Sequence, residues 1–359
     1  LFVAACGGGG GESSVPPGTP VGGGGGSGGG STPTEPVSKI DTEVEASRFL
    51  ARASFGGSKS DIASLNGGDA ADWLAREFSK SASLTMPALL AEPRNADGNL
   101  QSQRVNELYW DHIITANDQV RQRMAFALSQ IVVYSDAADN DQLMRAYYQD
   151  IMIRNAFGNF RDLLQEVTYS PAMAEWLTYL RNRKGDEKTG RMPDENYARE
   201  ILQLFSIGLI ELNMDGTPRL DGQGQQIETY NNDDIIGLAR VFTGLSYAGD
   251  DFWDTPDDGD IQQLQMYEDQ HSPLEKTFLG TTIPAGTPGN ETINTALDTI
   301  FAHPNVAPFV SRQLIQRFTQ SNPSPAYVQN VANAFETGRF NASNGRSFGT
   351  GQRGALQAT

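Results

Sequence analysis

The sequence of 359 residues contains one cysteine, Cys6, and three histidines. A single cysteine cannot close a disulfide within the chain, and it cannot supply a cysteine-based metal site. The histidines lie far apart and no H-E-x-x-H pattern occurs, which argues against a histidine-rich zinc site. No Walker A loop occurs either, because the glycine runs near the N-terminus lack the lysine of such a phosphate-binding loop. The cofactor, if the protein has one, is therefore unknown from the sequence.

Long apolar runs and an excess of basic charge are also missing. After residue 40 no stretch of 18 or more apolar residues occurs, so the sequence predicts no transmembrane helix. The chain has 44 acidic residues against 27 basic ones, and its formal net charge is -17. Such a chain repels the phosphates of nucleic acid, so we expect no nucleic-acid partner. The acidic segments at 136–141 and 250–260 lack the twelve-residue calcium-loop pattern, and we predict no metal-binding residues.

The N-terminus shows the pattern of a bacterial lipoprotein. Apolar and small residues at 1–5 precede Cys6, and a tract rich in Gly, Ser, Pro and Thr follows at 7–38. This order is typical of the remnant of a signal peptide, the cysteine that receives the lipid, and a disordered flexible spacer. We therefore predict lipidation of Cys6 and a membrane partner through this anchor; the alternative is a free cysteine on a disordered tail. Gly7, where an aspartate would oppose export, favours an outer-membrane lipoprotein facing the periplasm or the cell surface.

Residues 39–337 show helical patterns almost throughout. Thr42 with Glu45, and Ser58 with Asp61, form capping-box patterns that predict two short helices. Apolar residues at helical spacing predict further helices. They cover residues 70–79, 101–115, 118–134, 141–155, 159–168, 171–181, 194–211, 232–244, 292–302, 305–319 and 325–336, with Asn117 and Asn232 as expected N-caps.

Two turn signals interrupt this helical pattern. Asp215-Gly216 and Asp221-Gly222 predict a small hairpin, with a return strand near Ile227 and Tyr230. We therefore expect an all-α fold: a multi-helix domain with a single core and a small β-hairpin insert. Residues 338–359 are expected to form a polar tail, and their helix-like ending suggests a C-terminally truncated chain.

The predicted helix at 194–211 separates into two faces when its residues are placed at steps of about 100°. The apolar face comprises Tyr197, Ile201, Leu202, Leu204, Phe205 and Leu209, and the polar face comprises Glu195, Asn196, Arg199, Glu200 and Gln203. Glu195 and Arg199 are four residues apart, as are Asn196 and Glu200, so each pair can interact. If the polar face meets solvent, these pairs contribute little stability. If it meets a cleft, it offers carboxylate, amide and guanidinium groups for a divalent cation, a sugar or a peptide.

A second polar stretch surrounds His271 in a long irregular segment, the kind of segment where binding residues gather. Glu275 and Lys276 follow it, and we expect both to contribute to binding. Neighbouring carboxylates such as Glu268 would raise the pKa of His271 or share a cation with it. The alternative is a surface histidine or one that fixes the loop through a hydrogen bond. We expect His112 to be packed and satisfied, and His303 to close a helix end as a favourable cation.

The motifs of this chain resemble a bacterial family catalogued as domain of unknown function 1800. The resemblance rests on the runs DENYAREILQLFSIGL from Asp194, NNDDIIGLARVFTG from Asn231, HSPLEKTFLG from His271 and HPNVAPFVSRQLIQRF from His303, and it covers nearly all of 45–337. It implies an exported or cell-surface bacterial protein that is mainly helical, with no established activity. Members often occur beside a second exported family that resembles sulfatases, which implies an envelope polysaccharide or a sulfatase-like protein as a partner.

Two functions stay open at this point. The first is an exported, lipid-anchored cell-envelope protein that binds or assembles an envelope polymer or a partner protein. The second is a hydrolase or lyase acting on extracellular polysaccharide. In that case Glu200 or Glu195 is the general acid or base, Arg199 orients the substrate, and His271 lies in the same pocket. Asn196 and Gln203 are binding residues in either case.

Overall fold

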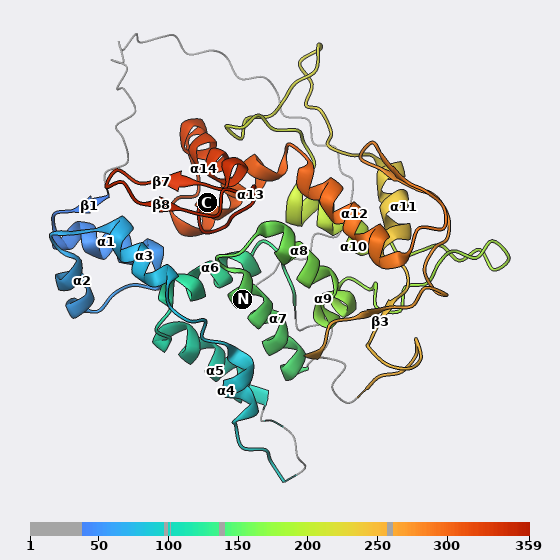
Figure 1. The fold of residues 1–359 in the computed structure, drawn as a ribbon, viewed down its shortest axis with the longest axis horizontal. Coiled ribbons are helices and arrows are strands. Elements are labelled where there is room, and N and C mark those ends of the chain that lie inside the picture. The colour runs from blue at the N-terminus through green and yellow to red at the C-terminus, as the bar shows by residue number, and fades with distance from the viewer. Residues whose placement is uncertain (1–37, 97–99, 101, 136–140, 257–260) are drawn as a thin grey trace, which may run out of the picture. The chain divides into compact units, whose positions relative to one another are not determined.

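Helices dominate the part of the chain that the structure describes (Figure 1). The computed structural model describes residues 38–96, 100, 102–135, 141–256 and 261–359; Cys6 and the spacer at 7–37 lie outside these ranges. The α-helices are α1 (Glu43–Ala53), α2 (Lys59–Leu65), α3 (Ala70–Phe78), α4 (Thr85–Leu90), α5 (Ser102–Thr115), α6 (Gln119–Ser129), α7 (Gln142–Asn155), α8 (Phe160–Thr168), α9 (Pro171–Trp176), α10 (Asn196–Glu200), α11 (Asn232–Val241), α12 (Gly289–Ala302), α13 (Val306–Phe318) and α14 (Pro325–Thr337). A π-helix, η1 (Ile201–Ser206), continues α10.

The strands are short and pair locally. They form four antiparallel two-stranded sheets: β1 (Lys39–Ile40) with β2 (Gly68–Asp69), β3 (Leu245–Ser246) with β4 (Gln265–Met266), β5 (Lys276–Phe278) with β6 (Thr281–Ile283), and β7 (Phe340–Asn341) with β8 (Ser347–Phe348). The prediction of an all-α fold with a small β insert is thus confirmed. No helix in the described ranges has the length and apolar character that a membrane crossing requires.

The sequence signals explain where most helices begin. Thr42 accepts a hydrogen bond from the backbone of Glu45, and the Glu45 carboxylate accepts one from the backbone of Thr42, which satisfies the first turn of α1. Ser58 and Asp61 cap α2 in the same way. Pro171 occupies the first turn of α9, where its missing N–H leaves no hydrogen bond unmade.

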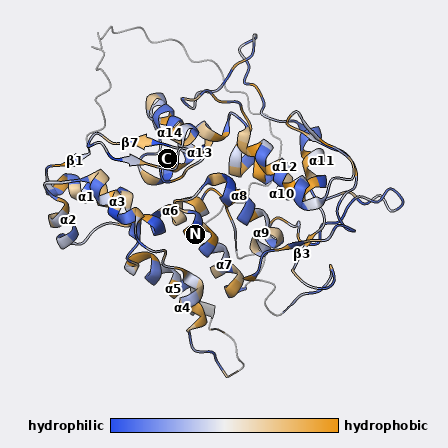
Figure 2. Ribbon diagram, in the orientation of Figure 1, coloured by the Kyte–Doolittle hydropathy of each residue, from blue (hydrophilic) through white to orange (hydrophobic). Residues whose placement is uncertain are grey.

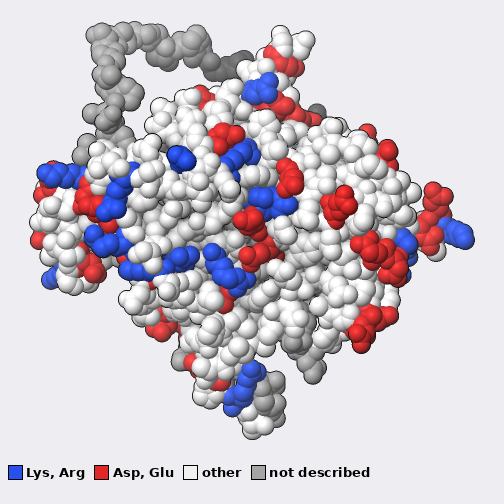
Figure 3. Space-filling view, viewed as in Figure 1, with Lys and Arg blue, Asp and Glu red and all other residues white. Residues whose placement is uncertain are grey.

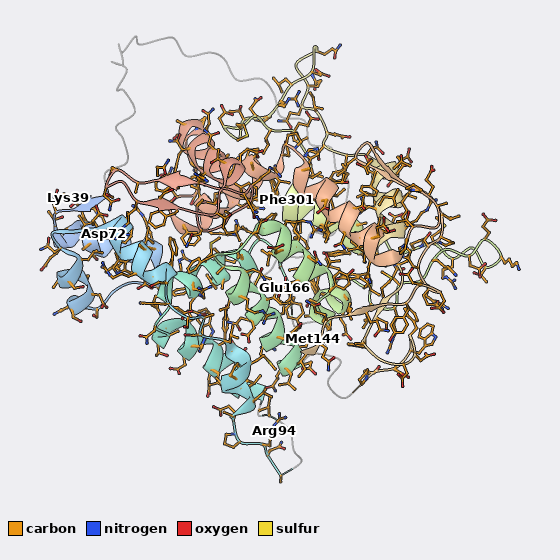
Figure 4. All side chains as sticks on the ribbon, viewed as in Figure 1. Lys39, Asp72, Arg94, Met144, Glu166 and Phe301 are labelled. Atoms are coloured by element: carbon orange, nitrogen blue, oxygen red, sulfur yellow. The ribbon has the colours of Figure 1, made fainter. Side chains whose placement is uncertain are left out.

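One large core holds most of the helices together. Helices α6 to α14 bury apolar side chains against one another, and Figure 2 shows their orange stripes alternating with blue ones. Met144, labelled in Figure 4, lies in this core on α7. Near its middle, the rings of Tyr179 and Tyr197 stack with centroids 4.3 Å apart, and Phe242 meets Tyr197 edge-on at 4.7 Å. Burial of such large rings contributes strongly to the stability of the core.

A smaller core lies between α1, α2 and α3, built from Ile40, Ala46, Leu50 and Leu65. The hairpin of β7 and β8 reaches this unit, because Arg346 pairs with Asp72 of α3, which Figure 4 labels. Residues far apart in the sequence are therefore neighbours here.

The segment 338–359 is not a polar tail. It belongs to the same compact unit as the helices, residues 36–359, and it buries Phe348, Ala355 and Leu356. Backbone bonds fix it at two places: Phe160 donates to the carbonyl of Gly354 at 2.9 Å, and Leu356 donates to that of Gly158 at 2.9 Å. The residues from Ala355 onward form turns, and no helix begins there. The polar and glycine-rich composition after Gly338 produced the expectation of a tail, and the residues from Ala355 to Thr359 produced the expectation of a helix.

Several helix boundaries also differ from the prediction. Helix α9 ends at Trp176 because Thr178 and Arg181 adopt positive φ angles of 60° and 58°, which an α-helix cannot contain. Helix α6 ends at Ser129. The N-caps of α6 and α11 are Asp118 and Asn231, each one residue before or after the asparagine expected there.

The predicted hairpin insert consists of three chain segments joined by backbone hydrogen bonds. The backbone of Glu211 donates to Ile227, Arg219 donates to Glu211, and Ile227 donates to Arg219, at 2.7–3.2 Å. Turns containing Asp215 and Asp221 join the three segments, and each aspartate accepts hydrogen bonds from the backbone that follows it. This insert stands beside the site described below.

We predict that Gly237→Ala destabilises the protein severely. A Cβ atom at Gly237 would lie 1.9 Å from the carbonyl oxygen of Thr277, because α11 packs directly on β5. Overpacking of this kind costs about 1–3 kcal/mol. The clash cannot be relieved by a change of rotamer, because the atom that the Cβ would meet belongs to the backbone of Thr277. The free energy of unfolding, measured by urea denaturation, should fall accordingly. Gly222→Ala is the control, since nothing lies within 4 Å of its Cβ position; equal losses in both variants would contradict the packing argument.

Candidate functional site

The predicted helix at 194–211 consists of two different helices. After Glu200 the backbone hydrogen bonds span five residues, as in a π-helix, and no longer four, as in an α-helix. The backbone of Ile207, for example, donates to the carbonyl of Leu202 at 3.0 Å. Gly208 donates to the same carbonyl at 2.9 Å and takes a φ of 71°, which ends the helix. Short π-helical segments are rare and occur frequently at functional sites.

The π segment changes which side chains face solvent. With an extra residue in the turn, Leu204 and Leu209 leave the apolar face on which α-helical spacing had placed them. They are 44 % and 54 % exposed, whereas Ile201, Leu202 and Phe205 are buried. The prediction of one continuous apolar face is therefore wrong for Leu204 and Leu209.

The exposed leucines line an open cavity of about 670 Å³. Its walls come from η1 and the chain that follows it, from the C-terminal end of α6, and from one face of α13. The lining residues are Gln130, Ile131, Val133, Gln203, Leu204, Gly208, Leu209, Ile210, Leu212, Phe309, Arg312, Gln313, Gln316 and Arg317. Amide and apolar groups prevail, and none of these residues is acidic.

A second cavity of about 340 Å³ adjoins the first. Gln203, Leu209 and Ile210 line both cavities, so the two form one depression, which we call the groove. The second cavity adds Arg199, Glu228, Tyr230, Asn231, Asn232 and Ile235 from α10, the β insert and the start of α11. Gln203 accepts a hydrogen bond from the Tyr230 hydroxyl at 3.4 Å at this junction.

The polar face of α10 only partly follows the predicted pairing. Arg199 forms the expected ion pair with Glu195 at 3.2 Å, and both are part-exposed. Asn196 does not bond to Glu200; its side-chain amide donates to the hydroxyl of Thr178 at 2.7 Å. Of the predicted site residues, Arg199 and Gln203 line the groove and Glu195 pairs with one of them.

Glu200 differs from Glu195, the N-cap residue of α10. Burial raises the pKa of its carboxyl, and the opposing effect of Arg199 is smaller. Its Oε2 atom is buried and has no hydrogen-bond partner among the described residues. Such a carboxyl retains its proton to a higher pH than a solvated one, which is a property of general acids. Glu200 itself lines neither cavity of the groove.

His271 is buried and lines neither cavity. Its Nδ1 bonds to the carbonyl oxygen of Thr243 at 2.8 Å, so the ring fixes the loop, one of the two alternatives left open above. Burial lowers the pKa of His271, and this outweighs the opposite effect of Glu268. Glu268 does raise this pKa, as expected, but desolvation of the ring is the larger effect and the pKa is lowered overall. The ring is therefore neutral at pH 7, and its Nε2 has no partner in the described part of the chain.

Lys276 is fully buried, whereas Glu275 is exposed and its carbonyl oxygen accepts a bond from Arg240. The ammonium group of Lys276 donates to the carbonyl oxygens of Ser272 at 2.7 Å and Leu274 at 3.0 Å. Burial lowers its pKa to about 8, and Arg240 acts in the same direction. These contacts make Lys276 a structural anchor of the loop, separate from the groove.

The other histidines have structural surroundings. His112 bonds through Nε2 to the carbonyl of Ser83 at 2.6 Å, as expected for a satisfied residue. His303 ends α12, but its Nδ1 accepts a hydrogen bond from the backbone of Asn305 at 3.2 Å and burial lowers its pKa. It is thus not the cation that was expected there. Within the described ranges, no three His, Cys, Asp or Glu residues are grouped closely enough to hold a metal ion.

Two features were missed by sequence reasoning. Gly345 to Gly349 spell a G-x-S-x-G pattern, but Ser347 is exposed on β8 in a hairpin, so the strand–turn–helix context of a nucleophile elbow is absent there. The α13 face is the more important omission. Phe309, Arg312, Gln313, Gln316 and Arg317 recur at helical spacing and form one wall of the groove. The available signal was a face at helical spacing on which Phe309 is followed by four polar residues.

The comparisons identify the family. The chain belongs to the family described as "Protein of unknown function (DUF1800)", whose profile matches residues 48–343. The match confirms the resemblance drawn from the motifs, and it includes α10, η1 and α13. No significant match was found among curated proteins or among solved structures.

We predict that burial of Lys276 makes the free energy of unfolding rise with pH in the alkaline range. Its pKa is about 8 in the folded chain and 10.5 when unperturbed, so between these values the unfolded chain binds more protons and stability rises with pH. The stability advantage of wild type over Lys276→Met should therefore grow by about 3 kcal/mol from pH 7.5 to 10.5. Urea denaturation across this range measures it. Lys188→Met, at an exposed loop position, is the matched control and should show no such growth; a flat difference for Lys276→Met would contradict the burial argument.

Proposed function

We propose that this protein is an exported, lipid-anchored protein of the bacterial cell envelope that binds an extended envelope polymer in the groove. The observation that carries the proposal is the groove itself, an open depression in which exposed leucines alternate with glutamine amides. Apolar side chains held out of the core at a concave surface mark interaction sites. These leucines are exposed because residues 201–206 form a π-helix. Such segments are rare and occur frequently at functional sites.

The chemistry of the groove suits a carbohydrate chain. Four glutamines, Gln130, Gln203, Gln313 and Gln316, present amide groups that both donate and accept, as sugar hydroxyls require of a partner. Leu204, Leu209 and Phe309 offer surfaces for the apolar faces of sugar rings. The groove continues from the larger cavity into the smaller one, which suits an extended occupant better than a compact one.

A polysaccharide hydrolase or lyase is the second candidate, and one observation favours it. Glu200 has a raised pKa and an unpartnered oxygen, next to Arg199 at the smaller cavity. Glycoside hydrolysis needs a second carboxylate on the other side of the bond, about 5–10 Å away. Glu228 lines that cavity and is the available residue, whereas His271 is not. Binding remains the primary proposal because Glu200 lies outside the lining of the groove.

The proposed localisation of the protein rests on Cys6 and the spacer after it. A thioether-linked diacylglycerol on Cys6, with further acylation, would hold the domain at a membrane while the spacer lets the groove reach polymer. We predict that mass spectrometry of the native N-terminus finds this modification and that the protein sediments with membranes. Cys6→Ser should move it to the aqueous fraction. An unmodified Cys6 thiol, or a wild-type protein that stays in the aqueous fraction, would remove the anchor from the proposal.

Binding is tested with the full chain and a panel of envelope polysaccharides, with dissociation constants measured by isothermal titration calorimetry. Leu209→Asp should weaken binding about tenfold or more, because it places a solvated charge on the apolar part of the groove. Leu220→Asp is the matched control, an equally exposed leucine outside the groove. Product release from the same panel, abolished by Glu200→Gln, would instead establish the hydrolase. Binding that Leu209→Asp leaves unchanged would place the site elsewhere.

A further inference from the structure

The larger cavity of the groove has a charge opposite to that of the chain as a whole. The protein has a formal net charge of -17, yet the residues that line this cavity include two arginines and no aspartate or glutamate. Figure 3 shows that charge is unevenly distributed on the face it displays, with blue side chains gathered on the side of α1 to α6 and red ones on the side of α11. A positive cavity in an acidic protein selects for an anionic group.

Arg312 is the exposed cation of this cavity. It lies on α13 between Phe309 and Gln316, in the middle of the wall. Among the described residues it has no ion pair and no side-chain hydrogen bond. Its guanidinium group therefore presents its donors to the groove, in the fork geometry that matches a carboxylate or a sulfate.

Arg317 also lines the cavity, and Arg123 adds positive charge next to it. Arg317 donates to the carbonyl oxygens of Gln130 at 2.7 Å and Gln313 at 3.1 Å, and its Nε is buried without a partner in the described part of the chain. Arg123 donates to the carbonyl of Arg317 at 2.6 Å and lies 5.2 Å from the ring of Phe318. Burial lowers the pKa of both arginines, and no carboxylate contributes to either value.

The half-buried Arg123 and Arg317 are energetically unfavourable without an anion nearby. A half-buried guanidinium loses hydration, and carbonyl oxygens replace only part of it. The chain carries 44 acidic residues, but none is paired with Arg123, Arg312 or Arg317 in the described ranges. An anionic ligand in the cavity would supply the missing countercharge.

The walls of the cavity are held in place before a ligand binds. Gln313 donates to the carbonyl oxygen of Leu204 at 3.2 Å, which fastens α13 to η1. Arg317 fastens α13 to the end of α6 through Gln130. A site whose walls are already fixed loses less entropy on binding than one that must form.

We propose that the groove binds an acidic polysaccharide, one whose sugars carry carboxylate or sulfate groups, and that Arg312 contacts these groups. This inference rests on the proposed function and adds the class of polymer. Sugar hydroxyls meet the glutamine amides and the leucines, while the anionic substituent meets Arg312. Widely spaced charges on a glycan suit this exposed cation better than the dense phosphates of nucleic acid, because the negative net charge of the chain repels a polyanion more strongly the denser its charges are.

The test compares each charged polymer with its neutral form. Polygalacturonate is matched with its methyl ester, and dextran sulfate with dextran, which separates carboxylate from sulfate recognition. Calorimetry with the full chain should show at least one charged form binding about tenfold or more tightly than its neutral partner, as charge-assisted hydrogen bonds predict. Arg312→Gln should remove most of that preference, because it should weaken binding of the charged form far more than binding of the neutral form. Arg312→Lys should restore part of it, and Arg48→Gln, at an exposed arginine of α1, should change nothing.

Other outcomes overturn the inference in distinguishable ways. Equal binding of charged and neutral forms, weakened by Leu209→Asp, would refute acidic recognition and leave the proposed function intact. No binding of any glycan, charged or neutral, would refute both. An oligothymidylate bound as tightly as polygalacturonate, with the same sensitivity to Arg312→Gln, would show a site for polyanions in general and refute the glycan.

Discussion

The groove depends on one carbonyl oxygen, that of Leu202. It accepts hydrogen bonds from the backbones of both Ile207 and Gly208, and so it sets the wide π turn and its end together. Gly208 completes the arrangement, because its positive φ and missing side chain admit the ring of Phe309, which a Cβ would meet at 2.5 Å. A regular α-helix through 194–211 would bury Leu204 and Leu209 and would close the surface on which the proposed function rests.

The fold was largely accessible from the sequence because its signals are local. Capping boxes, helical spacing and turn residues each act over a few positions, and they located most helices within a few residues. The errors lie where distant contacts decide. Helix α9 stops at Trp176 because positive φ angles are tolerated at Thr178 and Arg181, and the last residues fold because they pair with Gly158 and Phe160. Neither effect has a local pattern.

The candidate site was only half accessible, for the same reason. Periodicity identified the polar residues of α10, and Arg199 and Gln203 do line the groove. It could not reveal the π turn, because hydrogen-bond spacing leaves no trace in residue type. It also gave His271 and Lys276 a binding role, since polarity in a loop does not disclose burial; both are enclosed and bonded to loop carbonyls. Arg312 was overlooked because nothing in the local sequence marks it. It stands out only once the lining of the larger cavity is known to contain no acidic residue.

Ser38, the first residue that the structure describes, has a mechanical consequence. Its backbone donates to the hydroxyl of Ser343 at 3.1 Å, and its hydroxyl donates to Asp69 at 2.6 Å, so it is clasped by β2 and by the hairpin of β7 and β8. If the chain is anchored at Cys6 as proposed, tension along it enters the domain at Ser38, whose hydrogen bonds to Ser343 and Asp69 adjoin the small core of α1 to α3. Helices α13 and η1 lie outside that small core, so the point where the spacer joins the domain is separate from the walls of the groove.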